Sequence, residues 1–396
     1  PPCHINYVSV AEAMGSLYGT AAQVITAVCG AMAGLGFVAL QFKVIARILI
    51  ILFHLESNLA TALAAAIVIL YSASGGIRAV TFTDVIQFFT FGAFIPILCL
   101  VVWNNLQAPI QVLDTLKDDP SFSLQEVIGW NPQFLYAVSL FLYFAIPAVY
   151  TPELFQRIAM AKDVSQAKTS LTYAAGIAFM ISSLISWLGI LLLTDNPGLE
   201  PQQVVGHMVD KYTYPGLKGF MSIGMTALAM STADSCLNSF SVLFANDVVK
   251  PLMNQEVGSI TVARVFSVTG GIVALSLALY SDDLLALLML SGSFCMPIFA
   301  MPMLMAVLGF RTSKRVALAS MAAGAMTATI WSVAYDNASS VTPSMLANLL
   351  VLLGAHYLLG EPKGWKKVDP NSPLGREHAA SREAWQSRIA AIKSFR

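Results

Sequence analysis

The sequence predicts an all-α, polytopic membrane protein. Of its 396 residues, 57% are hydrophobic and 11% are charged, whereas soluble domains carry about 25% charged residues. Apolar runs of about 20 residues, long enough for a helix to cross a bilayer, recur along the chain. The mean hydropathy of +0.70 agrees with these runs. The expected surroundings are therefore a lipid bilayer.

The composition also argues against several other classes of protein. The formal net charge is zero, so no basic surface indicates a nucleic-acid partner. All five cysteines except Cys3 lie in apolar runs, which is typical of helix packing and not of a disulfide framework or a metal cluster. The histidines are scattered, and the chain has no Gly-rich phosphate loop. We therefore expect no enzyme.

The apolar runs are interpreted as about ten membrane helices. Turn sequences such as SGG at 74–76 and NPG at 196–198 separate them. The predicted helices span residues 15–52, 57–76, 79–104, 131–151, 168–194, 214–246, 258–280, 284–310, 314–335 and 342–360. Residues 1–360 thus form one transmembrane domain, and residues 361–396 form a polar, basic tail.

The distribution of basic residues predicts the orientation. Alternate loops hold Lys and Arg, among them Arg78, Arg157, Lys250 and Arg311, while the loops between them hold mainly acids. Because basic loops stay on the inner side, we expect a multi-pass protein of the cell inner (plasma) membrane. An even number of helices then places both ends of this chain in the cytoplasm.

One predicted helix carries a cluster of oxygen-bearing side chains. ALAMSTADSCLNS at 227–239 contains Ser231, Thr232, Asp234 and Ser235 within little more than one turn. A carboxylate inside a membrane is a candidate functional group, and carboxylates and hydroxyls are ligands for a small hard cation such as sodium. The alternative is that each hydroxyl bonds to its own helix or to a neighbouring one.

Other membrane segments also contain unusual residues. Asp84, in GGIRAVTFTDVIQFF, is a second acid within an apolar helix, although an acid near a helix N-terminus also interacts favourably with the helix dipole. Prolines interrupt YFAIPAVYTPELFQR at Pro147 and Pro152. The stretch MLSGSFCMPIF at 289–299 is interrupted by Ser291, Gly292, Ser293 and Pro297. Such interruptions line a pathway or simply kink a helix.

Four stretches carry a resemblance to a known family. They are GGIRAVTFTDVIQ at 75–87, QRIAMAKDVSQAK at 156–168, MSTADSCLNSFSVLFANDVVKPL at 230–252 and, less specifically, GFRTSKRVALASMAAG at 309–324. Together they resemble the sodium/solute symporter family over nearly the whole apolar part of the chain.

The resemblance implies a leucine-transporter-type fold, with two inverted repeats of five helices and additional helices. VSVAEAMGSLYG at 8–19 is similar to the end of the second core helix, where Glu12 matches an acidic position. The chain is therefore expected to be N-terminally truncated, lacking the first core helix and most of the second.

The resemblance also implies sodium as the coupling ion, held at two sites. The main site would use the Leu228 carbonyl and the hydroxyls of Ser231 and Thr232. The second site, present in some members, would combine carboxylates and hydroxyls of two helices: Asp84, Ser231, Asp234 and Ser235.

The substrate is implied less directly. Sugar carriers of the family have polar residues where this chain has Phe144, Thr151 and Pro152, which argues against sugar. Pro152 resembles the proline at that position in proline carriers, although Ala148 replaces a tyrosine. A small organic solute, such as the amino acid proline, is the expectation. The predicted pathway comprises Phe144, Pro147, Ala148, Thr151, Pro152, Ser291, Ser293 and Glu12.

The function these features predict is sodium-coupled secondary transport by alternating access. Two alternatives stay open. The tail SREAWQSRIAAIKSFR is also what a symporter-like sensory domain of a histidine kinase would show before a cytoplasmic signalling domain after residue 396. A transport-inactive homologue is the other alternative, and sodium-dependent uptake would separate it from a carrier.

Overall fold

The structure is a computed structural model and is almost entirely helical in the part it describes. The described residues are 7–105, 112, 114, 116, 117, 129, 131, 134, 137, 138, 140, 141, 151–196, 204–253, 260–281, 284–334, 340–361, 364 and 365. Most of the predicted helix 131–151 and most of the tail 361–396 lie outside these residues. Within the described residues, seven segments are long and apolar enough to cross a membrane.

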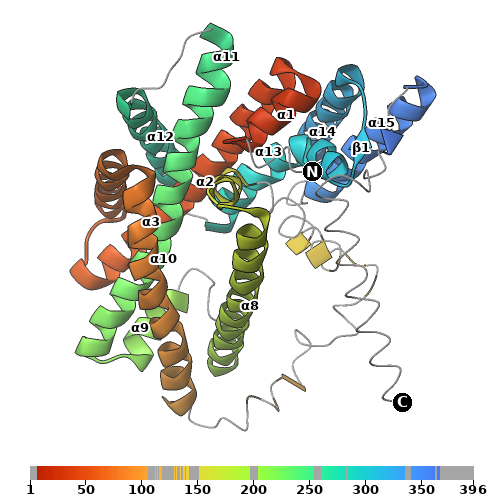
Figure 1. Cartoon of the computed structure of the whole chain (residues 1–396). Coiled ribbons are helices and arrows are strands. Elements are labelled where there is room, and N and C mark those ends of the chain that lie inside the picture. The colour runs from red at the N-terminus through yellow and green to blue at the C-terminus, as the bar shows by residue number, and fades with distance from the viewer. Residues whose placement is uncertain are drawn as a thin grey trace, which may run out of the picture.

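The elements follow one another in the order shown in Figure 1. The helices are α1 (Val10–Tyr18), α2 (Thr20–Phe53), α3 (Ser57–Asn105), α7 (Pro152–Ala159), α8 (Val164–Asp195), α9 (Val204–Tyr212), α10 (Pro215–Val242), the π-helix η4 (Leu243–Val249), α11 (Lys250–Met253), α12 (Ile260–Tyr280), α13 (Leu284–Val307), α14 (Lys314–Ala334) and α15 (Val341–Leu358). The short strands β1 (Phe310–Arg311) and β2 (Gly364–Trp365) pair antiparallel.

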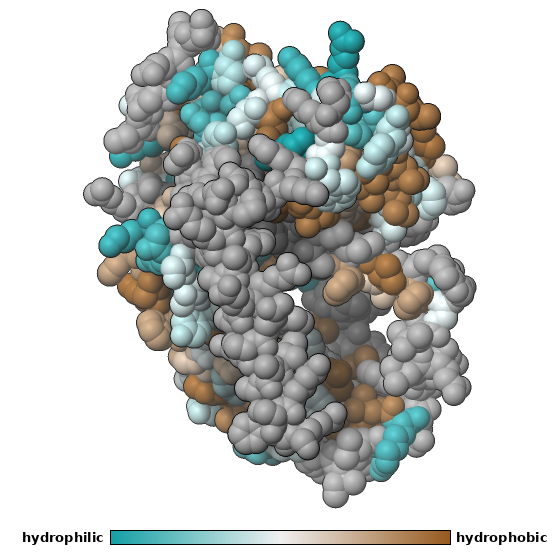
Figure 2. All heavy atoms as spheres, turned by 45° about the vertical axis from the view of Figure 1, so that its right-hand side comes forward, coloured by the Kyte–Doolittle hydropathy of each residue, from teal (hydrophilic) through white to brown (hydrophobic). Residues whose placement is uncertain are grey.

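Many large apolar side chains face outward. Phe89 of α3 is 69% exposed and Phe179 of α8 is 77% exposed. Figure 2 shows such side chains in brown along the flank, with hydrophilic side chains in teal gathered mainly toward the upper end. Soluble monomers rarely expose this much apolar surface. The exposed faces of these helices therefore suit contact with lipid.

The predicted helix 15–52 is wrong at its start, because helix begins at Val10 and is interrupted at Gly19. Gly19 has a φ of 89°, which is costly for any residue with a Cβ atom. Ser9 caps α1 by accepting from the Glu12 amide at 2.9 Å, and the Glu12 carboxylate accepts from the Val8 amide at 2.8 Å. These contacts resemble a capping box, a sequence signal that explains the earlier start.

The two predicted helices 57–76 and 79–104 form one continuous helical segment, α3. The prediction of a break at the SGG stretch is therefore wrong. The hydroxyl of Tyr71 nevertheless hydrogen-bonds the hydroxyl of Thr83. Residues 12 apart in a straight helix lie about 18 Å apart along its axis, too far for these side chains to meet. The helix must therefore bend between them, where the glycine pair weakens it.

The centre of the fold is α10, which packs against both α2 and α3. In Figure 1, α10 and η4 run from α9 at the lower end to α11 at the upper end. Gly224 of α10 lies directly under the Phe94 ring, since a Cβ atom there would come within 2.6 Å of that ring. Close approach at this glycine fixes α10 against the part of α3 that follows the bend.

The helix α10 ends differently from the predicted span 214–246. It is α-helical to Val242 and then continues as the π-helix η4 to Val249. A π-helix contains an extra residue per turn relative to an α-helix and is frequent at functional sites. Two short helices, α7 and α9, were not predicted, because each is shorter than a membrane span.

The helix α13 continues through Pro297 and Pro302 to Val307, three residues short of the predicted end. Pro302 has no amide hydrogen to donate to the Ile298 carbonyl. The buried Asn348 of α15 supplies the missing donor, with its Nδ2 atom 2.7 Å from the Ile298 oxygen and 2.9 Å from the Pro297 oxygen. A neighbouring helix therefore satisfies the Ile298 carbonyl that Pro302 would otherwise leave unpaired.

We predict that Asn348→Leu lowers the free energy of unfolding by about 1–3 kcal/mol, because it leaves buried carbonyls without a donor. Thermal unfolding of the purified protein in detergent measures this. Asn105→Ala is the matched control, since Asn105 is exposed and, among the described residues, its side chain bonds its own helix at Val101. An Asn348→Leu protein as stable as the parent would show that α13 does not depend on this amide.

Candidate cation site

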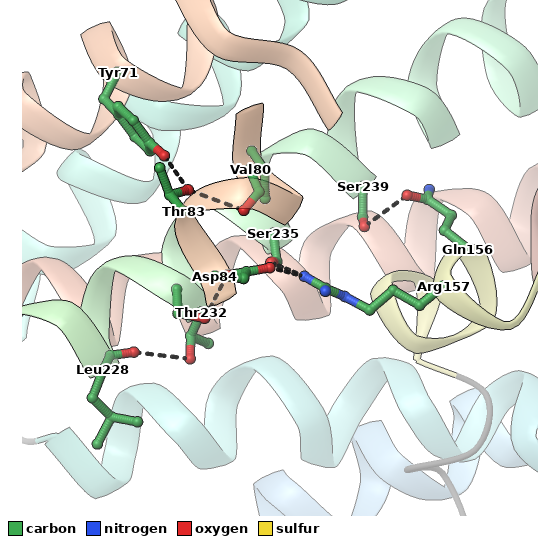
Figure 3. Close-up of polar contacts among 11 residues, drawn as sticks. Tyr71, Val80, Thr83, Asp84, Gln156, Arg157, Leu228, Thr232, Ser235 and Ser239 are labelled. Atoms are coloured by element: carbon green, nitrogen blue, oxygen red, sulfur yellow. Dashed lines mark hydrogen bonds and ion pairs between the residues drawn. The ribbon is translucent and has the colours of Figure 1, made fainter. Parts of the chain in front are cut away.

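Asp84 of α3 is the centre of a polar cluster between α3, α7 and α10. Its Oδ1 atom accepts a hydrogen bond from the Ser231 hydroxyl at 2.6 Å. Its Oδ2 atom lies 2.5 Å from Nη2 of Arg157, with which it forms an ion pair. Figure 3 shows Asp84 and Arg157 pointing toward one another from different elements. Both oxygens of this carboxylate are therefore engaged.

Arg157 is the residue that sequence reasoning missed. The same Nη2 atom also donates to the Ser235 hydroxyl at 2.7 Å, so one guanidinium joins α10 to α3. The signal was present in the QR pair that opens QRIAMAKDVSQAK, but Arg157 was counted only as a marker of orientation. In the structure, the Arg157 guanidinium contacts Asp84 and Ser235, two of the residues that were predicted to hold sodium.

The short helix α7 brings Arg157 into this position. Thr151 is its extended N-cap residue and Pro152 occupies its first turn, a placement that proline favours. The Pro152 ring lies against Gly30 of α2, where a Cβ atom would come within 3.1 Å. The buried Ser239 hydroxyl donates to Oε1 of Gln156 at 3.1 Å. These contacts fix α7 to the long helices on two sides.

Asp234 lies beside this cluster and is fully buried. Neither of its carboxylate oxygens has a hydrogen-bond partner among the residues that the structure describes. Ser235, Asp84 and Arg157 are close enough to act on it electrostatically. An ionised carboxylate without donors is costly to bury, so these two oxygens would favour an added cation.

Thr232 and Leu228 lie apart from the ion pair. The Thr232 hydroxyl donates to the Leu228 carbonyl at 3.4 Å, within its own helix, which is the local alternative considered from the sequence. Leu228 is 38% exposed. Of the six predicted ion ligands, the structure thus brings together Asp84, Ser231 and Ser235, with Asp234 next to them. Thr232 and Leu228 bond to each other within α10.

A small pocket adjoins the cluster. Its volume of about 20 Å³ exceeds the 10–15 Å³ that one water molecule needs. Burial raises the pKa of the Glu153 carboxyl at its edge, while the charge of Arg157 opposes that rise. The lining residues come from α3, the α7 region and α10: Val80, Thr81, Glu153, Gln156, Arg157, Met160, Ser235, Asn238 and Ser239.

The predicted substrate pathway is only partly described. Phe144, Pro147 and Ala148 lie outside the described residues. Ser291 and Ser293 lie on α13, of which only the backbone is described at these positions. Thr151 and Pro152 begin α7, and Glu12 caps α1. The predicted pathway therefore stays a prediction.

The cluster fits the chemistry of an alkali cation. Its ligands are carboxylate and hydroxyl oxygens, which hard cations prefer, and Asp234 adds two buried oxygens that lack donors. In the described part of the chain, no group of three His, Cys, Asp or Glu side chains could hold a transition metal. The fold defines a multi-pass helical membrane protein, and its oxygen-lined polar cluster is a candidate cation site.

The chain belongs to the sodium:solute symporter family, whose sequence pattern matches residues 4–324. This confirms the resemblance drawn from the four sequence stretches. It also supports sodium as the ion that the chain uses.

Individual relatives are transporters. The chain is 28% identical over 249 residues to high-affinity choline transporter 1 of Drosophila melanogaster, covering 58% of this chain and 39% of that protein. It is 24% identical over 314 residues to the high-affinity proline transporter PutP of Bacillus subtilis, covering 75% of this chain and 64% of that protein. The chain thus spans between 39% and 64% of the length of these two relatives.

A solved structure confirms the fold. It is the substrate-bound, outward-open state of a Na⁺-coupled sialic acid symporter, with a TM-score of 0.76. The sequence identity is 17%, and the match covers 90% of this chain and 80% of that chain. The prediction of a leucine-transporter-type fold is therefore confirmed.

Proposed function

We propose that this protein carries a small organic solute across the membrane by alternating access, driven by sodium. The observation that supports this best is the cluster of Asp84, Ser231, Ser235 and the buried Asp234. Its oxygens already bind a cation, the Arg157 guanidinium. A second cation of the right size would use the same ligands once the side chain of Arg157 withdraws.

In this mechanism Arg157 and sodium compete for one set of oxygens. Sodium enters among Asp84, Ser231, Asp234 and Ser235, and the guanidinium moves toward solvent, where its side chain is already 42% exposed. When sodium leaves, Arg157 pairs again with Asp84. The cluster thus keeps a counter-charge in both states, which lowers the cost of keeping two carboxylates inside the membrane. In the proposed orientation, α7 lies at the cytoplasmic side.

The solute we propose is an amino acid, with proline as the first candidate. The proline transporter PutP of Bacillus subtilis matches 75% of this chain, a larger share than the choline transporter does. Pro152, the residue that resembles the proline carriers, is placed at the start of α7. Choline is the competing candidate in the same assay.

Uptake of labelled proline and choline by the full-length protein in membrane vesicles tests this function. We expect sodium to support proline uptake and potassium to fail. Ser231→Ala should raise the sodium concentration for half-maximal uptake about tenfold, the effect of losing ~1.4 kcal/mol of binding free energy.

Ser241→Ala is the matched control for that variant. Ser241 is buried on the same helix, but its hydroxyl donates only to its own helix at Leu237, at 2.9 Å. Sodium dependence should be unchanged in Ser241→Ala. Uptake that proceeds equally in sodium and potassium would refute the proposed coupling.

A further inference from the structure

A second buried acid lies beyond the end of α10, on the π-helix η4. Asp247 is fully buried. The Gln23 side chain of α2 donates from Nε2 to its Oδ1 atom at 2.9 Å, and Asn246 approaches the same oxygen at 3.5 Å. Ser9 and Glu12 of α1 also lie close enough to act on this carboxylate. Three elements therefore converge on Asp247.

The acid is incompletely satisfied. Its Oδ2 atom has no hydrogen-bond partner among the described residues, and the same holds for the fully buried Thr26 hydroxyl. Thr26 lies three residues after Gln23 on α2, so both side chains share a helix face. None of the groups known to act on Asp247 carries a positive charge, and Glu12 adds a negative one. In the described part of the chain, this site therefore contains acceptor oxygens without a paired positive charge.

The second acid is in line with the first cluster. Ser235, Ser239, Leu243 and Asp247 follow one another at intervals of four residues, so the side chains of α10 share a face that η4 extends. Leu243 is fully buried. It lies near Gly30 of α2, against which the Pro152 ring also packs. An apolar contact thus separates the pocket at Ser239 from the acid at Asp247.

We propose that Asp247 forms a second alkali-cation site in addition to the candidate site at Asp84. The cation would be held by the free Oδ2 atom of Asp247 and the hydroxyls of Thr26 and Ser9. The carboxylate of Glu12 adds negative charge. Leu243 separates the site from the Asp84 cluster, and in the proposed orientation the site lies on the cytoplasmic side of Leu243. It therefore receives sodium that has left the Asp84 cluster. This inference deepens the proposed function, on which its role in transport rests. A single buried carboxylate with hydroxyl ligands suits a monovalent cation better than calcium, which takes six to eight oxygens.

The test measures sodium binding without transport. A ligand that binds only the folded state raises the melting temperature, so the purified full-length protein is melted in detergent over a range of sodium chloride, with potassium chloride as the reference. Asp84→Asn removes the first site. We expect this variant to keep about half of the sodium-specific shift of the parent, and Asp84→Asn with Asp247→Asn to keep none.

Thr26→Val provides a second variant that changes no charge and keeps the shape of the side chain. In the Asp84→Asn background it should raise the sodium concentration at half-maximal shift at least threefold. A sodium shift that survives Asp247→Asn unchanged, or one already absent in Asp84→Asn alone, would overturn the proposal. So would a shift that lower pH reproduces in potassium, because Asp247 would then hold only a proton.

The two proposals fail in different ways. Uptake that ignores sodium would remove the proposed function but would leave a sodium-dependent melting temperature intact. Sodium-coupled uptake together with a melting temperature indifferent to Asp247 would remove the second site alone.

Discussion

Asp84→Asn should raise the sodium concentration for half-maximal uptake by about 100-fold, equivalent to ~2.8 kcal/mol. The amide has nearly the shape of the carboxylate, but it carries no charge and replaces one acceptor oxygen with a donor. It therefore removes one negative charge and one of the two oxygens, now held by Ser231 and Arg157, that would coordinate sodium. Charge-assisted contacts of this kind are about twice as strong as neutral ones. Sodium-dependent uptake in vesicles measures the effect.

The matched control for Asp84→Asn is Asp163→Asn. Asp163 lies on the same side of the fold, where it caps α8 by accepting from the Gln166 amide at 2.7 Å. Its replacement should leave the sodium dependence of uptake within twofold of the parent, since that carboxylate contacts no group of the cluster. Equal sodium dependence in Asp84→Asn and the parent would exclude Asp84 as an ion ligand.

The cluster itself could be predicted in part from the sequence. Asp84, Ser231 and Ser235 stood out because polar side chains within apolar runs have few ordinary explanations. Asp84 and Ser231 are 147 residues apart in the sequence. Only the resemblance to a family predicted that they lie together in the fold. Periodicity alone indicates which face of a helix is polar, not which helix lies opposite.

Arg157 could not be found in the same way. A basic residue in a loop is already explained by the rule that orients membrane proteins, so its sequence gave no reason to look further. Only the packing of α7 against α2 and α10, through Pro152 and Gln156, brings the guanidinium back to Asp84. Arg157 thus joins the cluster at Asp84 through tertiary contacts that the sequence alone does not indicate.

The helix boundaries were wrong where tertiary contacts override local propensity. The glycine pair after Ser74 predicts a break, yet the chain bends and stays helical, with Tyr71 and Thr83 in contact. Pro302 leaves the Ile298 carbonyl without its donor in α13, yet the helix continues because Asn348 donates to that carbonyl. In both places the compensating partner is distant in sequence or lies beyond the bend, so no local pattern contains it.

Arg157→Gln should separate sodium affinity from transport rate. Because the guanidinium occupies Asp84 and Ser235, sodium has to displace it, and removing this competitor should lower the sodium concentration for half-maximal uptake about tenfold, or ~1.4 kcal/mol. The maximal rate should fall by a similar factor. Without Arg157, the sodium-free carrier has two acids, Asp84 and Asp234, with no counter-charge. Its return to the outward-open conformation therefore becomes slower.

Two further variants decide whether charge is the cause. Arg157→Lys keeps the positive charge but loses the guanidinium fork, so it should retain more of the maximal rate than Arg157→Gln does. Lys162→Gln removes an exposed positive charge that follows the end of α7. It should change neither the sodium concentration for half-maximal uptake nor the maximal rate. If Arg157→Gln instead weakens sodium binding, the guanidinium supports the site and does not compete for it. The exchange of arginine for sodium would then have to be abandoned.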